Sequence, residues 1–213
     1  LKIDIEIPFK RLTWQESMDK YGSDKPDLRF DILLNDITDL LKDTKIKFFK
    51  NVIESNGCIK CIKLKDSNKF SRKELDDIIE IAKNNGAGGL VWIKIENEME
   101  FVSPIAKFIS DSEKKDIIND LDLKEGNMLL IVADTFKNTS QALSAVRNHI
   151  GRKLDLVDDD KFNFLWVYDF PLFEYDESEK RLSSLHHPFT MPTKETIKFL
   201  DADPLKVNSI AYD

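Results

Sequence analysis

The spacing of apolar residues changes from segment to segment along the chain, and these changes predict its secondary structure. Residues 2–7 alternate between charged and aliphatic side chains, which is typical of a half-buried strand. Thr13 and Glu16 have the spacing of a capping box, which predicts a helix that runs from there to Tyr21. Gly22 then supplies the residue type that ends helices.

The central part of the chain alternates between helical and strand-like patterns. A strong helix signal follows Ser71, where apolar residues recur at helical spacing until Gly86. The other predicted helices cover 37–41, 48–54, 112–121 and 139–154. The predicted strands cover 58–64, 90–95 and 128–133. Helices interleaved with strands in this way favour a two-layer α/β domain.

A different pattern appears toward the C-terminal end of the chain. The continuous apolar run from Phe164 to Val167 predicts a strand that is buried on both faces. The strand breaks at Pro171, enters a charged turn and returns to two adjacent histidines, His186 and His187, which precede Pro188. A buried hairpin that carries two histidines back toward the core predicts one wall of an active site.

Three ordered blocks of the sequence resemble the bacterial-type aspartyl-tRNA synthetases, which are class II aminoacyl-tRNA ligases. The first block is IPFKRLTW followed by YGSDKPDLR. The second comprises SRKE, the Gly86–Ala87 turn before LVWIK, and SPIAKF, and it is similar to the insertion called the GAD domain. The third is FNFLWVYDFPLFEYD with HHPFT. The resemblance covers essentially the whole chain.

The resemblance implies an α+β fold in three parts. Residues 1–30 and 156–213 are expected to be segments of the antiparallel-sheet catalytic domain, and residues 31–155 the GAD insertion domain. The intact enzyme would activate aspartate with ATP and Mg²⁺, transfer the aspartyl group to tRNA, and be a homodimer. The family's two arginine motifs that hold ATP would lie outside this chain. We therefore expect the chain alone to be inactive, with no catalytic residue or metal site of its own.

The resemblance also assigns the candidate site residues. The first histidine of HHPF contacts the amino-acid substrate in the family, which makes His186 the candidate for binding aspartate. An ionised carboxylate only accepts hydrogen bonds, and histidine can donate them. His187 precedes a proline and should be extended, so its ring is expected to face away from His186 in a supporting role or toward the adenylate. Asp169 is a candidate for orienting a donor or holding Mg²⁺. A core histidine and a turn carboxylate are the structural alternatives.

Two further motifs have both a chemical and a structural reading. Cys58 and Cys61 show CxxC spacing, but they lie in a predicted strand, where residues three apart face opposite sides. They are therefore predicted to be reduced thiols rather than metal ligands. Gly86–Gly89 could suggest a phosphate loop, but it follows a helix rather than a strand and is predicted to be a helix end.

The composition of the chain limits which partners and which cellular locations we expect for it. The net charge of −7 argues against a nucleic-acid contact spread over the whole chain, so any tRNA contact should be local. No apolar stretch approaches the roughly 20 residues of a membrane helix and no signal peptide is seen, which predicts a cytoplasmic location without membrane contact.

Two alternative functions stay open at this point. One is a tRNA-dependent amidotransferase subunit, because a GAD-type insertion also occurs there. The other is an interaction domain without chemistry. HHPFT disfavours the first, and the two strands that need partners from a larger sheet disfavour the second.

Overall fold

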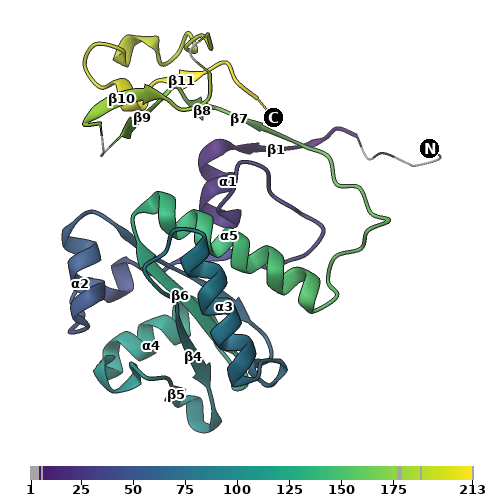
Figure 1. Ribbon diagram of the computed structural model, residues 1–213, viewed down its shortest axis with the longest axis vertical. Coiled ribbons are helices and arrows are strands. Elements are labelled where there is room, and N and C mark those ends of the chain that lie inside the picture. Colours follow the sequence, from purple (N-terminus) through teal and green to yellow (C-terminus); the bar gives the residue numbers. More distant parts are fainter. Residues whose placement is uncertain (1–4, 6, 177–178, 188, 213) are drawn as a thin grey trace. The chain divides into compact units, whose positions relative to one another are not determined.

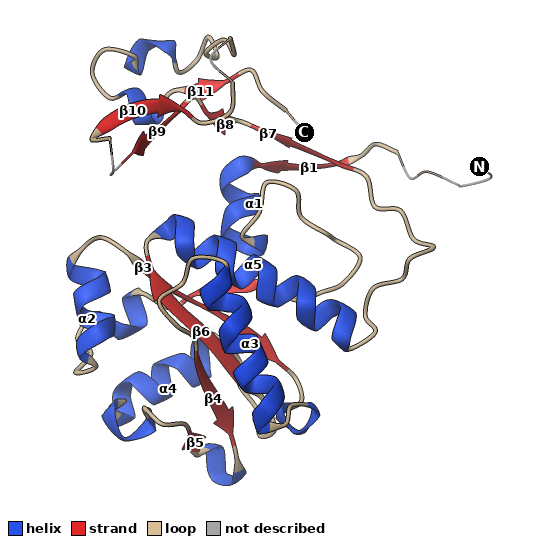
Figure 2. Cartoon of the chain, in the orientation of Figure 1, coloured by secondary structure: helices blue, strands red, loops and turns tan. Residues whose placement is uncertain are grey.

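The chain folds into two compact units in a computed structural model that describes residues 5, 7–176, 179–187 and 189–212 (Figures 1 and 2). Unit 1 comprises the described residues of 1–18, 24–26 and 161–213. Unit 2 comprises residues 19–23 and 27–160. Most of the strand predicted over residues 2–7 lies outside the described residues.

Unit 2 is built around a five-stranded sheet in the order β2–β3–β6–β4–β5. The strands are β2 (Leu34–Asp36), β3 (Cys58–Leu64), β4 (Val91–Ile95), β5 (Phe101–Val102) and β6 (Met128–Asp134). Every neighbouring pair is antiparallel, and β3 pairs with β6 over seven residues. The three strands predicted for this region are therefore confirmed, and β3 and β6 form the centre of the sheet.

Helices cover both faces of this sheet. They are α2 (Lys47–Glu54), α3 (Arg72–Asn84), α4 (Asp111–Asp120) and α5 (Phe136–Lys153). On one face, α3 and α5 pack on Ile62 and Leu130; on the other, Phe49 of α2 and Ile117 of α4 join the core around Leu129. The predicted mixed α/β class is confirmed. Three layers replace the expected two, because successive residues of β3 and β6 point to opposite faces and both sets are apolar.

The sequence signals that start and end the helices act as predicted. The Ser71 hydroxyl accepts a hydrogen bond from the Glu74 amide, and the Glu74 carboxylate accepts from the Ser71 amide at 2.7 Å. At the other end of α3, Gly86 adopts a φ of +97°, and its amide donates to the Lys83 carbonyl. The glycine-rich segment 86–89 therefore follows a helix end, as the sequence predicted.

The two cysteines lie on opposite faces of β3, as the strand spacing predicted. Cys61 belongs to the core beneath α2 and α4, whereas Cys58 lies on the face covered by α5, near the buried Thr139. Burial raises the pKa of both thiols. Both are uncharged at neutral pH and behave as small apolar core residues.

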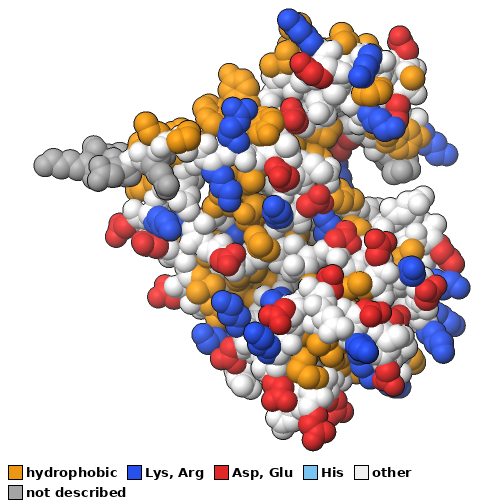
Figure 3. Space-filling model, turned by 180° about the vertical axis from the view of Figure 1, so that it is seen from behind, with side chains coloured by type: hydrophobic (Ala, Val, Ile, Leu, Met, Phe, Trp, Pro, Cys, Tyr) orange, Lys and Arg blue, Asp and Glu red, His pale blue; other side chains and the backbone are white. Residues whose placement is uncertain are grey.

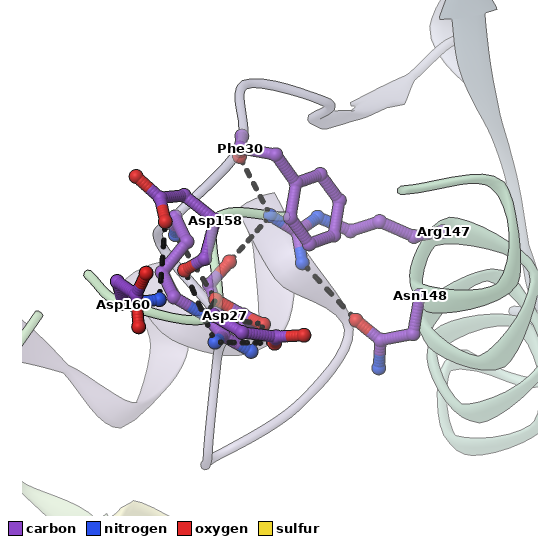
Figure 4. A network of polar contacts seen from close by, with 8 residues as sticks. Asp27, Phe30, Arg147, Asn148, Asp158 and Asp160 are labelled. Atoms are coloured by element: carbon purple, nitrogen blue, oxygen red, sulfur yellow. Dashed lines mark hydrogen bonds and ion pairs between the residues drawn. The ribbon is translucent and has the colours of Figure 1, made fainter. Parts of the chain in front are cut away.

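A buried arginine on α5 holds the segment through which the chain enters unit 2 (Figure 4). The Arg147 side chain donates to the carbonyls of Ile32 at 2.5 Å, Asp27 at 2.7 Å and Phe30 at 3.1 Å. Its guanidinium lies 4.0 Å from the centre of the Phe30 ring. Burial lowers the pKa of Arg147 to about 10, which leaves the guanidinium charged at neutral pH.

Ion pairs of Arg29 join the incoming and outgoing segments of unit 2. The Arg29 guanidinium donates to both carboxylate oxygens of Asp27 and also contacts the Asp159 carboxylate at 3.3 Å. The Arg29 side chain holds the pKa of Asp27 below its usual range. The segment around residue 27 is thus tied to the segment around residue 159.

Lys60 is a second buried cation in unit 2. Its ammonium donates to the Asp19 carboxylate at 2.8 Å and lies 4.6 Å from the centre of the Phe136 ring. The Lys60 side chain is only 1% exposed, so the ammonium depends on that carboxylate. Asp19 lies in helix α1 (Trp14–Tyr21), which begins in unit 1 and ends in unit 2.

Helix α1 follows the predicted signals at both ends. The Glu16 amide donates to the Thr13 hydroxyl at 3.1 Å, and the Glu16 carboxylate accepts from the Thr13 amide at 2.9 Å. This is the reciprocal capping box. At Gly22 the φ is +68°, and an added Cβ would lie 2.3 Å from the Ser140 carbonyl oxygen, so only glycine fits.

The described strands of unit 1 form three two-stranded sheets. Strand β1 (Lys10–Thr13) pairs with β7 (Leu165–Tyr168) in parallel. Strand β8 (Phe170–Pro171) pairs with β11 (Asn208–Ser209), and β9 (Phe173–Asp176) with β10 (Arg181–Ser184), both antiparallel. The predicted hairpin that leads to the histidines is therefore present as β9–β10.

The burial predicted for β7 on both faces is wrong for this chain. Val167 is 2% exposed, but Phe164 and Trp166 are 49% and 42% exposed. The physical reason is that, within the described residues, β7 belongs to a two-stranded sheet with β1 as its one partner, and so small a sheet covers little of its surface. The strands of the β9–β10 hairpin are likewise half-buried to exposed, and none of their residues is buried.

Replacing Arg147 with methionine should lower the free energy of unfolding of unit 2 by about 3 kcal/mol, because three buried carbonyls lose their donor. The control is Arg152→Met, an exposed position on the same helix, which should change it by less than ~0.5 kcal/mol. Urea unfolding followed by circular dichroism measures both. Equal effects would contradict the anchoring role of Arg147.

The same contacts predict how the insertion can be excised. A segment covering 19–160 keeps the Asp27 and Phe30 carbonyls and the Asp19 carboxylate, whereas the sequence-based segment 31–155 loses all three. The longer segment should be the more stable by about 3–5 kcal/mol, because the shorter leaves the Lys60 charge buried and unpaired. Circular dichroism in urea compares the two segments. Coincident unfolding curves would show that the boundary at residue 31 is sufficient.

Candidate functional site

A pocket of about 350 Å³ opens in unit 1 beside the paired strands β1 and β7. Its lining combines a cation, a carboxylate, aromatic rings and hydroxyl groups. These side chains are Arg11, Asp169, Trp166, Tyr168, Tyr212, Thr193 and Ser209. Such a lining is mostly apolar with a few polar groups, as small-molecule sites usually are.

The parallel pairing of β1 and β7 builds the wall of this pocket. Arg11 lies opposite Trp166 in the register, and its guanidinium carbon lies 4.7 Å from the centre of the Tyr168 ring. The rings of Trp166 and Tyr212 meet edge to face, with 5.6 Å between their centres. One cation therefore lies against an aromatic wall contributed by two distant parts of the chain.

Asp169 lines the same pocket, at the junction between β7 and β8. Its φ of +58° is in the left-handed region, which a residue other than glycine seldom adopts. The buried Ser209 hydroxyl donates to the carbonyl of the next residue, Phe170, at 3.1 Å and fixes the backbone there. The exposed Asp169 carboxylate is held in the pocket at the cost of this backbone conformation.

His186 lies at the end of the β9–β10 hairpin, outside the lining of the pocket. Its ring meets the buried Phe170 ring edge to face at 4.6 Å, and the preceding Leu185 amide donates to the Leu172 carbonyl. The imidazole itself is exposed. The alternative of a core histidine therefore does not describe His186 in this chain.

His187 has different neighbours. Its Nδ1 accepts a hydrogen bond from the Phe189 amide at 3.3 Å, and the two rings are 5.0 Å apart. In the neutral ring this leaves the proton on Nε2. The extended conformation expected from Pro188 rests on a residue outside the described ones. The bond to Phe189 directs His187 toward its own turn, whereas His186 packs on Phe170.

Asp169 and His186 are both linked to Phe170: Asp169 precedes it in the chain, and the His186 ring packs on its ring. Sequence reasoning identified both but missed Arg11, Trp166 and Tyr212. The missing signal was the parallel register of β1 and β7, which joins segments more than 150 residues apart and has no local sequence signature.

None of the helices in the described part of the chain is long and apolar enough to cross a membrane.

A comparison with models of protein families identifies the type of domain to which most of unit 2 is similar. Residues 49–143, which run from α2 to α5, match the model of the GAD domain. The chain therefore carries a GAD domain, as its central sequence block predicted.

The whole chain is similar in sequence to aspartate–tRNA ligases. It is 45% identical over 213 residues to the aspartate–tRNA(Asp/Asn) ligase of Thermoanaerobacter sp. (strain X514), which covers all of this chain and 36% of that protein. It is 43% identical over 210 residues to the enzyme of that name from Desulfatibacillum aliphaticivorans, covering 99% of this chain and 35% of the relative. It is 44% identical over 212 residues to the aspartate–tRNA ligase of Clostridium novyi (strain NT), covering 99% and 36%.

The chain spans about a third of the length of these relatives. The resemblance to aspartyl-tRNA synthetases is thereby confirmed over the whole chain, including the segment that matches the GAD domain.

Proposed function

We propose that this chain is part of an enzyme that joins aspartate to tRNA. The observation that carries the proposal is the 45% identity over all 213 residues, which extends far beyond the GAD domain into unit 1. In the proposed reaction the α-carboxylate of aspartate attacks the α-phosphate of ATP, which gives aspartyl-adenylate and pyrophosphate. The terminal ribose hydroxyl of tRNA then takes the aspartyl group and releases AMP.

The proposal includes aspartate, ATP and tRNA as substrates, a homodimeric complete enzyme and a cytoplasmic location. It also includes Mg²⁺, which would neutralise phosphate charge. Within the described residues no group of three or more histidine, cysteine or acidic side chains could hold a metal ion. These residues do not fit a Mg²⁺ site by themselves, so no step is assigned to the metal here.

We assign binding of the substrate aspartate to His186. The exposed imidazole has Phe170 on one side, so that packing orients the ring while its nitrogens stay open to a ligand. A donor at this position suits a carboxylate, which accepts hydrogen bonds only. His187 is assigned a supporting role, because its Nδ1 is occupied by the Phe189 amide.

Asp169 is assigned the role of orienting a donor. It lines the pocket together with Arg11, which is the cation whose placement it can influence. The two side chains give the pocket one negative and one positive charge, and a carboxylate near a guanidinium can fix its orientation.

We also propose that residues 31–155 are an insertion domain between two catalytic-domain segments, 1–30 and 156–213. The match to the GAD domain falls inside the proposed insertion. The direct pairing of β1 with β7 supports the proposal, since it joins the two flanking segments into one sheet.

The two alternative functions have less support. An amidotransferase subunit or an interaction domain would share the GAD domain, but the similarity to ligases continues through the β7–β10 region and HHPFT, to the end of the chain.

The complete enzyme should exchange pyrophosphate into ATP when aspartate is present. The 213-residue chain alone should show no exchange, because it spans only about a third of the length of its relatives. The assay measures labelled ATP with aspartate, with asparagine and without amino acid. Exchange by the chain alone would overturn its assignment as an incomplete part, and no exchange by the complete protein would overturn the proposed reaction.

In the complete enzyme, His186→Ala should impair the use of aspartate more than His187→Ala. Loss of one donor to a bound carboxylate should reduce kcat/KM for aspartate by about 10- to 150-fold. The KM for ATP should change much less, because His186 is assigned to the amino acid. Exchange kinetics of the two single variants measure this. Equal or inverted effects on aspartate would sink the assignment of His186.

A further inference from the structure

A cluster of exposed lysines surrounds the start of helix α2 in unit 2. Four lysines fall within nine consecutive residues, and all four are exposed. They are Lys42, Lys45, Lys47 and Lys50, and together with the exposed Phe48 they are called the lysine patch below. The chain as a whole has a net charge of −7, and Figure 3 shows basic and acidic side chains interspersed over the visible face. A second exposed basic stretch, Lys65, Lys69, Arg72 and Lys73, is equally dense, so what distinguishes the lysine patch is its pairing and its exposed aromatic ring.

Ion pairing within unit 2 does not account for these charges. Lys50 lies 3.7 Å from Glu54, and both side chains are more than half exposed, so water and salt screen that pair. Among the described residues, Lys42, Lys45 and Lys47 have no carboxylate within 4 Å, although Asp43 lies between them in sequence. Three of the four charges are thus available to an external anion.

Helix stability does not account for them either. The N-terminal end of a helix carries partial positive charge and favours acidic residues. The first turn of α2 has no acidic residue and contains Lys47, and the preceding Ile46 offers no capping side chain. The other main helices of unit 2 that begin with capping boxes place Glu74 and Glu113 at this position instead. The basic start of α2 therefore works against the helix that carries it.

Phe48 adds an aromatic surface to the lysine patch. Its side chain is 42% exposed and lies beside the buried Phe49, with 4.2 Å between the ring centres. An exposed ring among lysines is the combination that binds RNA, since lysines contact phosphates and rings stack on sugars or unpaired bases. Lysine ammonium groups contact phosphate as point charges and need no fixed geometry.

We propose that the lysine patch binds the phosphate backbone of tRNA. This inference rests on the proposed function, because tRNA is the polyanion that the reaction requires. The patch adjoins the first residue matched by the GAD domain, Phe49, so it gives this unit a specific contact with tRNA. A local contact of this kind also agrees with a chain whose overall charge is negative.

The test uses the complete enzyme with Lys42, Lys45 and Lys47 all replaced by glutamine. The control replaces Lys83, Lys115 and Lys124 with glutamine; these are exposed lysines far apart in the sequence of unit 2, so the control has the same net charge without removing a cluster. Binding of a tRNA transcript is measured by fluorescence anisotropy at several salt concentrations. Aspartate-dependent pyrophosphate exchange, which needs no contact with this surface, is measured in parallel.

The patch variant should bind tRNA roughly 10-fold more weakly at about 0.1 M salt. Its plot of log affinity against log salt should be less steep by about 1 for each lysine removed, or about 3 in total. The control variant should match the unsubstituted enzyme in its affinity for tRNA and in the slope of log affinity against log salt. Equal slopes for the patch and control variants, with exchange intact, would overturn the lysine patch as a tRNA site. Absence of exchange in the unsubstituted enzyme would instead overturn the proposed function.

Discussion

The hydrogen bonds of the buried Arg147 guanidinium set how the chain enters unit 2. Three backbone carbonyls, at Asp27, Phe30 and Ile32, point at one side chain on α5. A buried arginine is stable only when its donors are satisfied, so the incoming segment and the longest helix must fold together. Arg29 then ties this incoming segment to the outgoing one through Asp159. Both ends of the unit are held at one place.

This arrangement explains how a large unit can interrupt a sheet. Strands β1 and β7 pair residue for residue, from Lys10 opposite Leu165 to Thr13 opposite Tyr168. Closing a long disordered loop between paired strands would cost conformational entropy. When the inserted unit is folded and its two ends are held together, the folding free energy of that unit offsets much of this entropy cost. The pairing of β1 with β7 in turn places Arg11 against the aromatic wall of the pocket.

Local signals in the sequence predicted most elements of unit 2. The capping boxes at Thr13 and Ser71 and the apolar runs of β3 and β6 were sufficient, because these features depend on residues only a few positions apart. Contacts between distant residues could not be predicted in this way. The anchoring role of Arg147, the parallel register of β1 and the second helical layer all depend on tertiary packing. The exposure of Trp166 shows the same limit, since a continuous apolar run does not reveal which partners cover it.

The candidate site likewise combines residues that the sequence identified with residues that only tertiary packing brings together. His186, His187 and Asp169 were identified from the sequence, and the structure packs the His186 ring on Phe170, the residue after Asp169. Arg11 enters the pocket through the pairing of β1 with β7, and Tyr212 through its contact with Trp166. The backbone of Asp169, with its φ of +58°, is a further feature that no sequence pattern disclosed.

The central claim is that this chain is part of an enzyme that charges tRNA with aspartate. The most direct measurement is the attachment of radiolabelled amino acids to tRNA by the complete enzyme, with aspartate and asparagine supplied separately. The account predicts that aspartate is esterified to tRNA and that asparagine is not. Charging with asparagine, or glutamine-dependent amidation of a preformed aminoacyl-tRNA without any charging, would contradict it.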